Sequence, residues 1–360
     1  MVNADSAKPR ARDLGVPFEG VPGPLNAITD VEGVEVGHVT LIEGDGPLIV
    51  GTGPIRTGVT AILPRGQASS APVFAGWFSL NGAGEMTGTA WIEESGLLEG
   101  PVMLTNTHSV GTVRDTVIAW QIERGRIPGP FSLPVVTETY DGWLNDTNGF
   151  HVKPSHVFAV LDNARSGPVA EGNVGGGTGM NCYQFKGGIG TASRVLERGA
   201  TVGVLVQANH GSRHQLRIAG LPVGLELSEA ALAEEARGSI IIVVATDAPL
   251  LPHQLKAVAR RAGLGMARTG GIAGLSSGDL FLAFSTANLD GADLANEVTV
   301  KMMGQRRISA VYEATVQATE EAIINALIAA ETMVGIDSHT MRALPHGRLQ
   351  QVLKKYNRMG

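Results

Sequence analysis

Apolar and polar residues follow one another along this chain in a pattern that mixes strands with helices. Seven segments are rich in β-branched and aromatic residues, which predicts strands. Several of them are apolar on both faces, as in sheets that are covered on both sides. The strand candidates are residues 59–63, 73–81, 102–107, 156–161, 201–209, 239–246 and 280–286.

Four further segments predict helices, each with a signal of its own. A serine precedes the first two as a candidate N-cap, a proline opens the third, and a glycine follows the second and the third. The fourth is the longest and is rich in Ala, Glu, Leu and Ile, which favour helices. The helix candidates are residues 110–123, 229–237, 252–262 and 310–333.

The interspersed strands and helices predict a layered α and β architecture with buried sheets. Residues 1–25 are rich in Pro, Gly and charge and predict an irregular arm. No linker rich in Pro and Ser divides the remainder of the sequence, so we expect a single domain over residues 1–360.

The amino-acid composition argues against several classes of protein and of site. Lys and Arg number 28 against 34 Asp and Glu, a formal net charge of −6, which argues against a protein that binds the phosphate backbone of nucleic acid. Apolar residues make up 43% and charged residues 17%, as in a well-buried globular protein. Cys182 is the single cysteine, which excludes a disulfide within the chain and a multi-cysteine metal site. We interpret it as a core residue.

The sequence also predicts the compartment. Residues 1–20 lack the apolar core of a secretory signal, and no apolar run approaches the length of a membrane span. We therefore expect a cytoplasmic protein that does not contact a membrane.

Three motifs that often mark chemistry stand in the wrong context. Residues 274–278 match the G-x-S-x-G nucleophile elbow, but a strand candidate follows them where an elbow needs a helix. The glycine-rich residues 172–179 lack the spacing of a dinucleotide site and the lysine of a P-loop, so we interpret them as a closely packed turn. His210 and His214 are four apart without a metalloprotease glutamate between them, so we do not expect a metal site.

The junction of Gly238 and Ser239 is the most informative place in the sequence. Ser239 is the first residue of the apolar strand candidate 239–246, and Gly238 stands directly before it. A self-cleaving N-terminal-nucleophile hydrolase needs such a pair, because glycine leaves its carbonyl open to attack and tolerates a strained backbone. Cleavage would leave Ser239 with a free α-amino group of pKa about 8, close to what a general base needs. The ordinary alternative is a serine in a turn.

Seven blocks of sequence, in order along most of the chain, resemble the DmpA family of L-aminopeptidase/D-Ala-esterase/amidases and β-peptidyl aminopeptidases. The block at 238–255, GSIIIVVATDAPLLPHQL, resembles the start of that family's small subunit. The other blocks are DVEGVEVGH at 30–38, TETYDGWLND at 137–146, EGNVGGGTGM at 171–180, FKGGIGTASR at 185–194, SSGDLFLAFSTAN at 276–288 and ATEEAIINAL at 318–327.

The resemblance implies an α+β fold, the four-layer αββα sandwich. It implies a precursor that cuts itself between Gly238 and Ser239 into a large subunit, residues 1–238, and a small subunit, residues 239–360. In the family, four such pairs form a homotetramer. The family removes N-terminal residues from small peptides, amino-acid amides or esters without a metal or cofactor, so we expect neither here.

The resemblance also assigns roles to single residues. Ser239 is at the position of the nucleophile, and Ser277 and Asp279 match the Ser-x-acidic pair that supports it. Some family members have Glu at that acidic position, and Asp279 is one carbon shorter. A carboxylate there would orient the Ser277 hydroxyl, which would exchange a proton with Ser239 or its amine.

Three further residues match family positions that contact the substrate or the oxyanion. Asn209 matches the amide that stabilises the oxyanion, and Tyr140 matches a tyrosine that helps to hold it. Glu138 matches the carboxylate that pairs with the free amine of the substrate.

Two alternatives stay open at this point. Acyl transfer to an amine, as in the related ornithine acetyltransferases, would use the same fold, although those enzymes have a threonine nucleophile where this chain has Ser239. A non-catalytic homologue would keep the fold without cleaving itself, and it would be expected to lack the nucleophile or its supporting pair.

Overall fold

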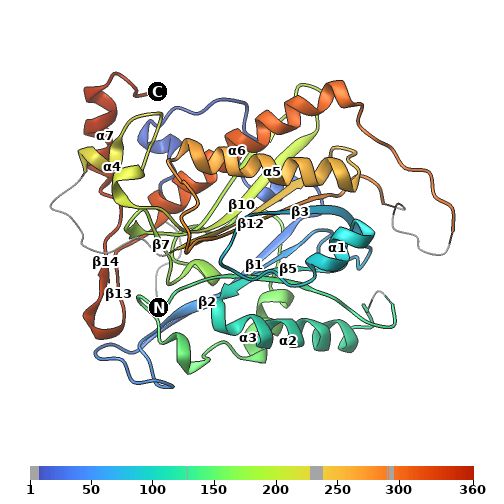
Figure 1. Cartoon of the computed structure of the whole chain (residues 1–360), viewed down its shortest axis with the longest axis horizontal. Coiled ribbons are helices and arrows are strands. Elements are labelled where there is room, and N and C mark those ends of the chain that lie inside the picture. Colours follow the sequence, from blue (N-terminus) through green and yellow to red (C-terminus); the bar gives the residue numbers. More distant parts are fainter. Residues whose placement is uncertain (1–7, 128, 228–237, 290, 292–295) are drawn as a thin grey trace.

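A computed structural model of the chain describes residues 8–127, 129–227, 238–289, 291 and 296–360. Two sheets lie face to face between two layers of helices (Figure 1). Helices α5 (Pro252–Arg268) and α6 (Ile308–Ala329) cover the six-stranded sheet, and α2 (Val110–Glu123) and α3 (Pro154–Asp162) cover the four-stranded one. The expected αββα sandwich is confirmed.

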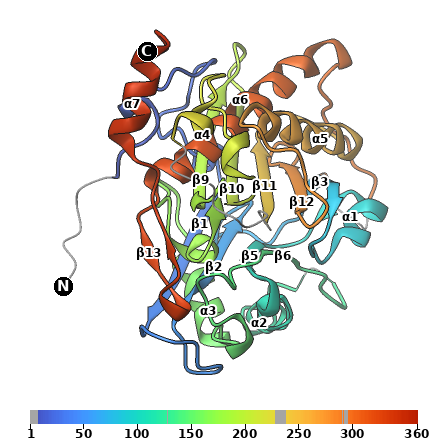
Figure 2. The same ribbon diagram turned by 60° about the vertical axis from the view of Figure 1, so that its left-hand side comes forward.

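The six-stranded sheet runs in the order β4-β3-β12-β11-β10-β9, and Figure 2 shows most of this order across the molecule. Its strands are β3 (Val73–Gly82), β4 (Leu97–Leu98), β9 (Gly188–Val195), β10 (Thr201–Asn209), β11 (Ser239–Thr246) and β12 (Gly278–Ser285). Residues on both sides of Gly238 therefore build one sheet.

The four-stranded sheet runs in the order β1-β2-β5-β6. Its strands are β1 (Glu35–Glu43), β2 (Ile55–Leu63), β5 (Val102–Asn106) and β6 (Val135–Thr139). Two small hairpins complete the strands: β7 (Asn181–Cys182) with β8 (Phe185–Lys186), and β13 (Met333–Val334) with β14 (Thr340–Met341). The remaining helices are α1 (Thr89–Ser95), α4 (Val223–Glu226) and α7 (His346–Lys355).

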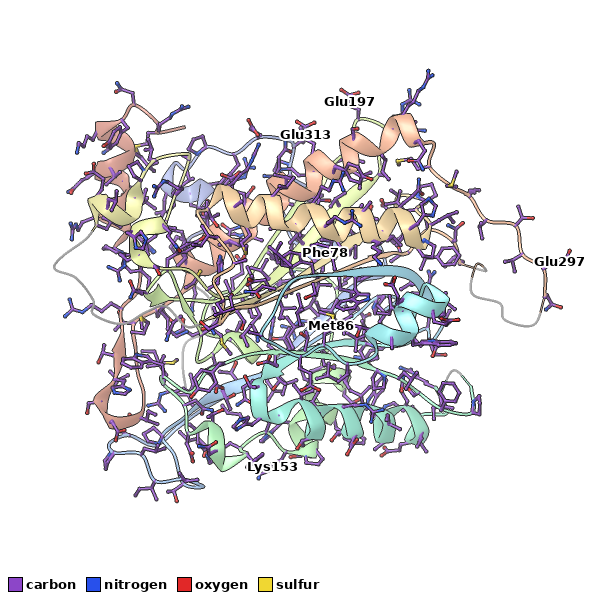
Figure 3. All side chains as sticks on the ribbon, in the orientation of Figure 1. Phe78, Met86, Lys153, Glu197, Glu297 and Glu313 are labelled. Atoms are coloured by element: carbon purple, nitrogen blue, oxygen red, sulfur yellow. The ribbon has the colours of Figure 1, made fainter. Side chains whose placement is uncertain are left out.

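The position of strand β11 between two apolar cores explains why its sequence is apolar throughout. Ile241 and Val243 join the core between the two sheets, while Ile240 and Ile242 join the core beneath α5 and α6. Successive side chains of a strand point to opposite faces, so a strand between two apolar layers needs apolar residues at every position. Figure 3 shows Met86, which belongs to the core between the sheets, lying between the two layers.

One predicted strand is wrong, because residues 156–161 belong to helix α3. Pro154 occupies the first turn of that helix, and the buried residues Val157, Val160 and Leu161 have helical spacing. The apolar run was too short to separate the two periodicities by composition alone.

The other predicted strands are confirmed, and three strands of five residues or more were missed, as were the five two-residue strands. Strand β1 has as many polar as apolar residues and only two buried positions, β6 is a short segment after a proline, and β9 contains Gly188 and Gly190, a residue type that is depleted in strands. Helix α2 has the predicted bounds, α5 extends to Arg268, and α6 ends at Ala329. The helix predicted at 229–237 lies outside the described residues.

Candidate active site

Three of the candidate residues meet at one end of the central strands. Strand β10 ends at Asn209, which pairs with Ser239 at the start of the antiparallel strand β11. The neighbouring strand β12 is parallel to β11 and begins beside it, so Asp279 pairs with Ile240. Strand direction and register thus bring Asn209, Ser239 and Asp279 together, although they are far apart in the sequence.

The backbone before Ser239 is tightly packed. A Cβ on Gly238 would lie 1.9 Å from the carbonyl oxygen of Asn209, so no larger residue fits there without a shift. The Oγ of Ser239 accepts a hydrogen bond of 3.0 Å from the backbone N–H of Gly278. Ser239 itself is 5% exposed, which places its hydroxyl in a site largely shielded from water.

Ser277 and Asp279 form a hydrogen-bonded pair. The Ser277 hydroxyl donates to Oδ1 of Asp279 at 2.7 Å, so the shorter aspartate side chain does reach its serine. Burial raises the pKa of Asp279 to about 6, while the bonds from the Ser277 hydroxyl and the Ile240 N–H lower it. Among the described residues the hydroxyls of Ser277 and Ser239 are not bonded to each other; Gly278 lies between Ser277 and Asp279 and donates to Ser239.

The side-chain amide of Asn209 is held at both ends. Its Oδ1 accepts from the backbone N–H of Asn181 at 2.7 Å, and its Nδ2 donates to the backbone carbonyl of Tyr140 at 2.9 Å. The two partners fix which end of the amide is the donor. An amide nitrogen carries two N–H donors, and the described structure uses one of them, which leaves the second for an oxyanion.

Tyr140 contributes its backbone to this arrangement rather than its hydroxyl. The side chain is 47% exposed and lies over Gly142, where an added Cβ would meet the Tyr140 Oη at 2.2 Å. The structure therefore places the Tyr140 carbonyl against Asn209 and its phenol at the surface.

Glu138 in β6 is a buried carboxylate with two fixed donors. Its Oε1 accepts from the backbone N–H of Glu85 at 3.0 Å, and its Oε2 accepts from the Thr107 hydroxyl. Burial raises the pKa of Glu138, the hydrogen bonds from Thr107 and Glu85 lower it, and the charges of Glu85 and Asp141 raise it. Loss of solvation is the largest of these effects, so a cation beside this carboxylate would be favoured.

Glu138 lies close to Ser239, although it belongs to the other sheet. A Cβ on Gly84 would be 3.2 Å from Oε1 of Glu138 and 3.1 Å from Cα of Gly278. Gly278 is the residue whose N–H bonds Ser239. The backbones of Gly84 and Gly278 thus lie between the Glu138 carboxylate and the Ser239 hydroxyl.

Sequence reasoning missed the groups that hold these side chains. The N–H groups of Gly278 and Asn181 act through the backbone, which leaves no side-chain signature in a sequence. Thr107 was placed in a strand without a role, although it follows β5 and bonds Glu138. The position of Asn181 directly after the glycine-rich residues 171–180 is the sequence feature that could have indicated its role.

The rejected motifs do not form the sites that their patterns suggest, although Ser277 and Gly278 of the first motif contribute to the candidate site in another way. Residues 274–277 form a loop, and β12 follows them, so the nucleophile elbow is absent. His210 is buried, which lowers its pKa to about 3, and its Nδ1 lies 3.7 Å from Sγ of Cys182. Burial raises the pKa of the Cys182 thiol to about 12. Within the described ranges, no three His, Cys, Asp or Glu residues are grouped as a metal site would require, and no helix has the length and apolarity to cross a membrane.

Comparison with known families and proteins gives consistent matches. The family model described as Peptidase family S58 matches residues 26–341. The β-peptidyl aminopeptidase BapA of Sphingosinicella microcystinivorans is 55% identical over 375 residues, which cover 99% of this chain and 94% of the relative. The β-peptidyl aminopeptidase BapA of Sphingosinicella xenopeptidilytica is 50% identical over 373 residues, which cover 98% and 92%.

Solved structures show the same similarity in three dimensions. The L-aminopeptidase D-Ala-esterase/amidase from Ochrobactrum anthropi, described as a variant of the Ntn hydrolase fold, matches with a TM-score of 0.92 and 50% identity over 98% of this chain and 100% of that one. A β-aminopeptidase from Burkholderia sp. matches with a TM-score of 0.88 and 50% identity over 96% of this chain and 98% of that one. Both likenesses agree with the αββα sandwich.

Proposed function

This chain belongs to peptidase family S58, the DmpA family, and is a serine aminopeptidase; from that premise we propose that Ser239 is its nucleophile, freed when the chain cuts itself after Gly238. The observation that carries the proposal is the meeting of Ser239, Asn209 and Asp279 at one end of three adjacent strands. A nucleophile, an amide donor and a supporting carboxylate are the parts that acyl chemistry at a serine requires.

Self-cleavage begins with attack of the Ser239 Oγ on the carbonyl carbon of Gly238. The Ser277 hydroxyl, which already donates to Asp279, moves within hydrogen-bond reach of Ser239 and relays the hydroxyl proton to the Asp279 carboxylate, and the second N–H of Asn209 Nδ2 stabilises the oxyanion. The C–N bond then breaks, the nitrogen takes up the proton, and Gly238 becomes an ester of Ser239. Water hydrolyses that ester, which leaves a carboxylate on Gly238 and a free α-amine on Ser239.

The same groups then act on a substrate. The α-amine of Ser239, with a pKa of about 8 in an unperturbed chain, accepts the proton of its own hydroxyl as the oxygen attacks the substrate carbonyl. The amine returns the proton to the leaving group, and a water molecule hydrolyses the acyl-enzyme. Asn209 stabilises the oxyanion in both halves of the reaction. Tyr140 stays a prediction, because its hydroxyl has to leave Gly142 to take part.

The substrate is an amine-bearing peptide, amide or ester of small size. Glu138 pairs with its ammonium group in a charge-assisted hydrogen bond. The carboxylate is 3% exposed and its pKa is raised by burial, so an arriving ammonium restores the charge balance of the site. An N-blocked substrate leaves the carboxylate buried without a counter-charge, which is costly.

The two fragments remain associated after cleavage. Strands β11 and β12 of the small fragment lie between β10 and β3 of the large one, so separation would break the centre of the six-stranded sheet. The family resemblance supports a tetramer of these pairs, which size-exclusion chromatography with light scattering tests.

The variant Ser239→Ala tests the proposed nucleophile. The change removes one oxygen and leaves the apolar packing of β11 intact, so the chain is expected to fold, to stay at full length and to have no aminopeptidase activity. Denaturing electrophoresis and hydrolysis of L-alanyl-p-nitroanilide measure both properties. Full-length Ser239→Ala with the wild-type rate would place the nucleophile elsewhere. A panel with L-Ala, D-Ala and β-homo-amino-acid anilides then defines the preferred substrate.

A further inference from the structure

Lys186 in β8 is a buried lysine to which the mechanism above gives no role. It has 0% exposure, and its ammonium donates to the carbonyl oxygens of Met180 at 2.6 Å, Gly187 at 3.0 Å and Gly177 at 3.5 Å. Within the described part of the chain, no carboxylate lies within ion-pair distance of it. A lysine without a direct counter-ion is rare in a protein interior, since burial disfavours its charge.

Burial makes the charged form of Lys186 unfavourable, and the pKa of its side chain reflects this. The pKa of Lys186 is lowered to about 7, mainly by burial; Cys182 and Asp141 raise it, and the charge of Lys8 lowers it. A methionine would occupy nearly the same volume without this cost. With such a pKa the amino group is only partly charged at neutral pH, but it keeps N–H donors in both forms, so its role is in hydrogen bonding rather than in filling space.

The carbonyls that Lys186 binds include those of a segment wedged between the two sheets. A Cβ on Gly176 would lie 2.7 Å from the carbonyl oxygen of Leu104 in the four-stranded sheet, and one on Gly177 would lie 2.4 Å from the N of Ile189 in the six-stranded sheet. Each carbonyl also accepts from a backbone N–H, that of Met180 from Gly187 at 2.8 Å and that of Gly177 from Met180 at 3.3 Å, and each oxygen has a second lone pair to satisfy. The ammonium supplies donors to Gly177 and Met180.

Lys186 and Asn209 bind opposite sides of a single peptide unit, the one that joins Met180 to Asn181. Its carbonyl accepts from Nζ of Lys186 at 2.6 Å, and its N–H donates to Oδ1 of Asn209 at 2.7 Å. Lys186 is also the cross-strand partner of Asn181 in the β7–β8 hairpin. A continuous hydrogen-bonded chain thus leads from the ammonium through a peptide and an amide to the free N–H of Asn209.

We propose that Lys186 is a positioning residue for the aminopeptidase reaction, which holds and polarises the Asn209 amide through the Met180–Asn181 peptide. The N–H donor of Lys186 Nζ draws electron density toward the peptide oxygen, which makes the N–H of Asn181 a stronger donor. That bond in turn polarises the Asn209 amide, so its remaining N–H becomes a better donor to the oxyanion. This inference rests on the oxyanion role proposed for Asn209.

A double-mutant cycle tests the proposal with the cleaved enzyme. Lys186→Met keeps the volume and removes the donors, and Asn209→Ala removes the group on which Lys186 is argued to act. We expect Lys186→Met to lower kcat by about tenfold or more, because a small displacement of a stabilising group is costly, with little change in KM. In the Asn209→Ala background the same change should alter kcat less than about twofold.

A matched control separates this role from stability. Thr269→Val removes a 2.8 Å hydrogen bond to the Tyr183 hydroxyl, in the turn of the same hairpin, without touching the Met180–Asn181 peptide. It should lower the melting temperature and leave kcat unchanged. If Lys186→Met yields no folded protein, Lys186→Gln, which keeps N–H donors and removes the charge, takes its place in the cycle.

The possible outcomes test the positioning role of Lys186 separately from the oxyanion role proposed for Asn209. Independent, multiplicative losses from Lys186→Met and Asn209→Ala would overturn the positioning role, as would a Lys186 variant that loses stability alone, like Thr269→Val. An Asn209→Ala enzyme with the wild-type kcat would instead overturn the oxyanion role itself.

Discussion

The two sheets of this protein carry different parts of the chemistry. The six-stranded sheet holds Ser239, Asn209 and Asp279, the groups proposed to make and break bonds. The four-stranded sheet supplies Glu138 from β6, with Thr107 at the end of β5, and Glu138 is the group proposed to bind the substrate amine. In this proposal the first set serves both self-cleavage and turnover, whereas the second meets a group that self-cleavage does not contain. Variants in the two sheets should therefore separate these activities.

The largest effect in this comparison is expected from Asn209→Ala. Loss of an oxyanion donor typically lowers kcat by about 10²–10³-fold, and the same donor serves the attack on Gly238. Self-cleavage and turnover should both slow by this factor, as a time course of electrophoresis and anilide hydrolysis would show. A variant that cleaves itself at the normal rate but fails in turnover would break the assignment of one shared oxyanion site.

The variant Glu138→Gln tests the part proposed for the four-stranded sheet, which is recognition of the substrate amine. Self-cleavage should be retained, while kcat/KM for free-amine anilides should fall by about 10²-fold, since a charge-assisted bond becomes a neutral one. N-acetylated anilides should be poor substrates of the wild type and should lose much less on mutation. Steady-state kinetics of one free and one acetylated anilide measures this. Equal losses on both substrates, or impaired self-cleavage, would point to a structural role for Glu138.

A smaller effect is expected in the pH dependence of kcat/KM, through the titration of Asp279 in the six-stranded sheet. The pKa of Asp279 is raised to about 6, so its carboxylate form, which orients Ser277, is present above that pH and is lost as the pH falls through it. The α-amine of Ser239 must also be neutral, with a pKa of about 8. We expect log kcat/KM of the wild type to rise steeply below pH 6 and less steeply between pH 6 and 8.

The cleaved fraction of Asp279→Asn provides the control for that profile. It should be slower overall and should lack the steeper segment, because only the α-amine titrates. An unchanged profile in this variant would separate Asp279 from the proton transfer.

The sequence predicts the parts of this molecule that depend on side-chain pattern. Strand β11 is apolar on both faces, and the Gly238–Ser239 junction before it is visible without a structure. Helix α3 was predicted as a strand, because an apolar run of this length fits either periodicity. Pro154, which starts the helix, is the signal that separates the two.

Features that depend on register or on backbone groups could not be predicted. The pairing of Asn209 with Ser239 depends on the register of β10 and β11, and the N–H donors of Gly278 and Asn181 belong to the main chain. Lys186 belongs to the family-like block at residues 185–194, but its link to Asn209 passes through a peptide bond and leaves no trace in residue spacing.

The central claim is that Ser239 becomes the N-terminal nucleophile of a small fragment. Intact mass and N-terminal sequencing of the freshly purified protein, followed until cleavage is complete, test it most directly. The account predicts two fragments, residues 1–238 and 239–360, with the second beginning Ser-Ile-Ile-Ile, and aminopeptidase activity that rises in step with their formation. A new N-terminus elsewhere, for instance at Ser277, or full activity in the uncut chain, would contradict it.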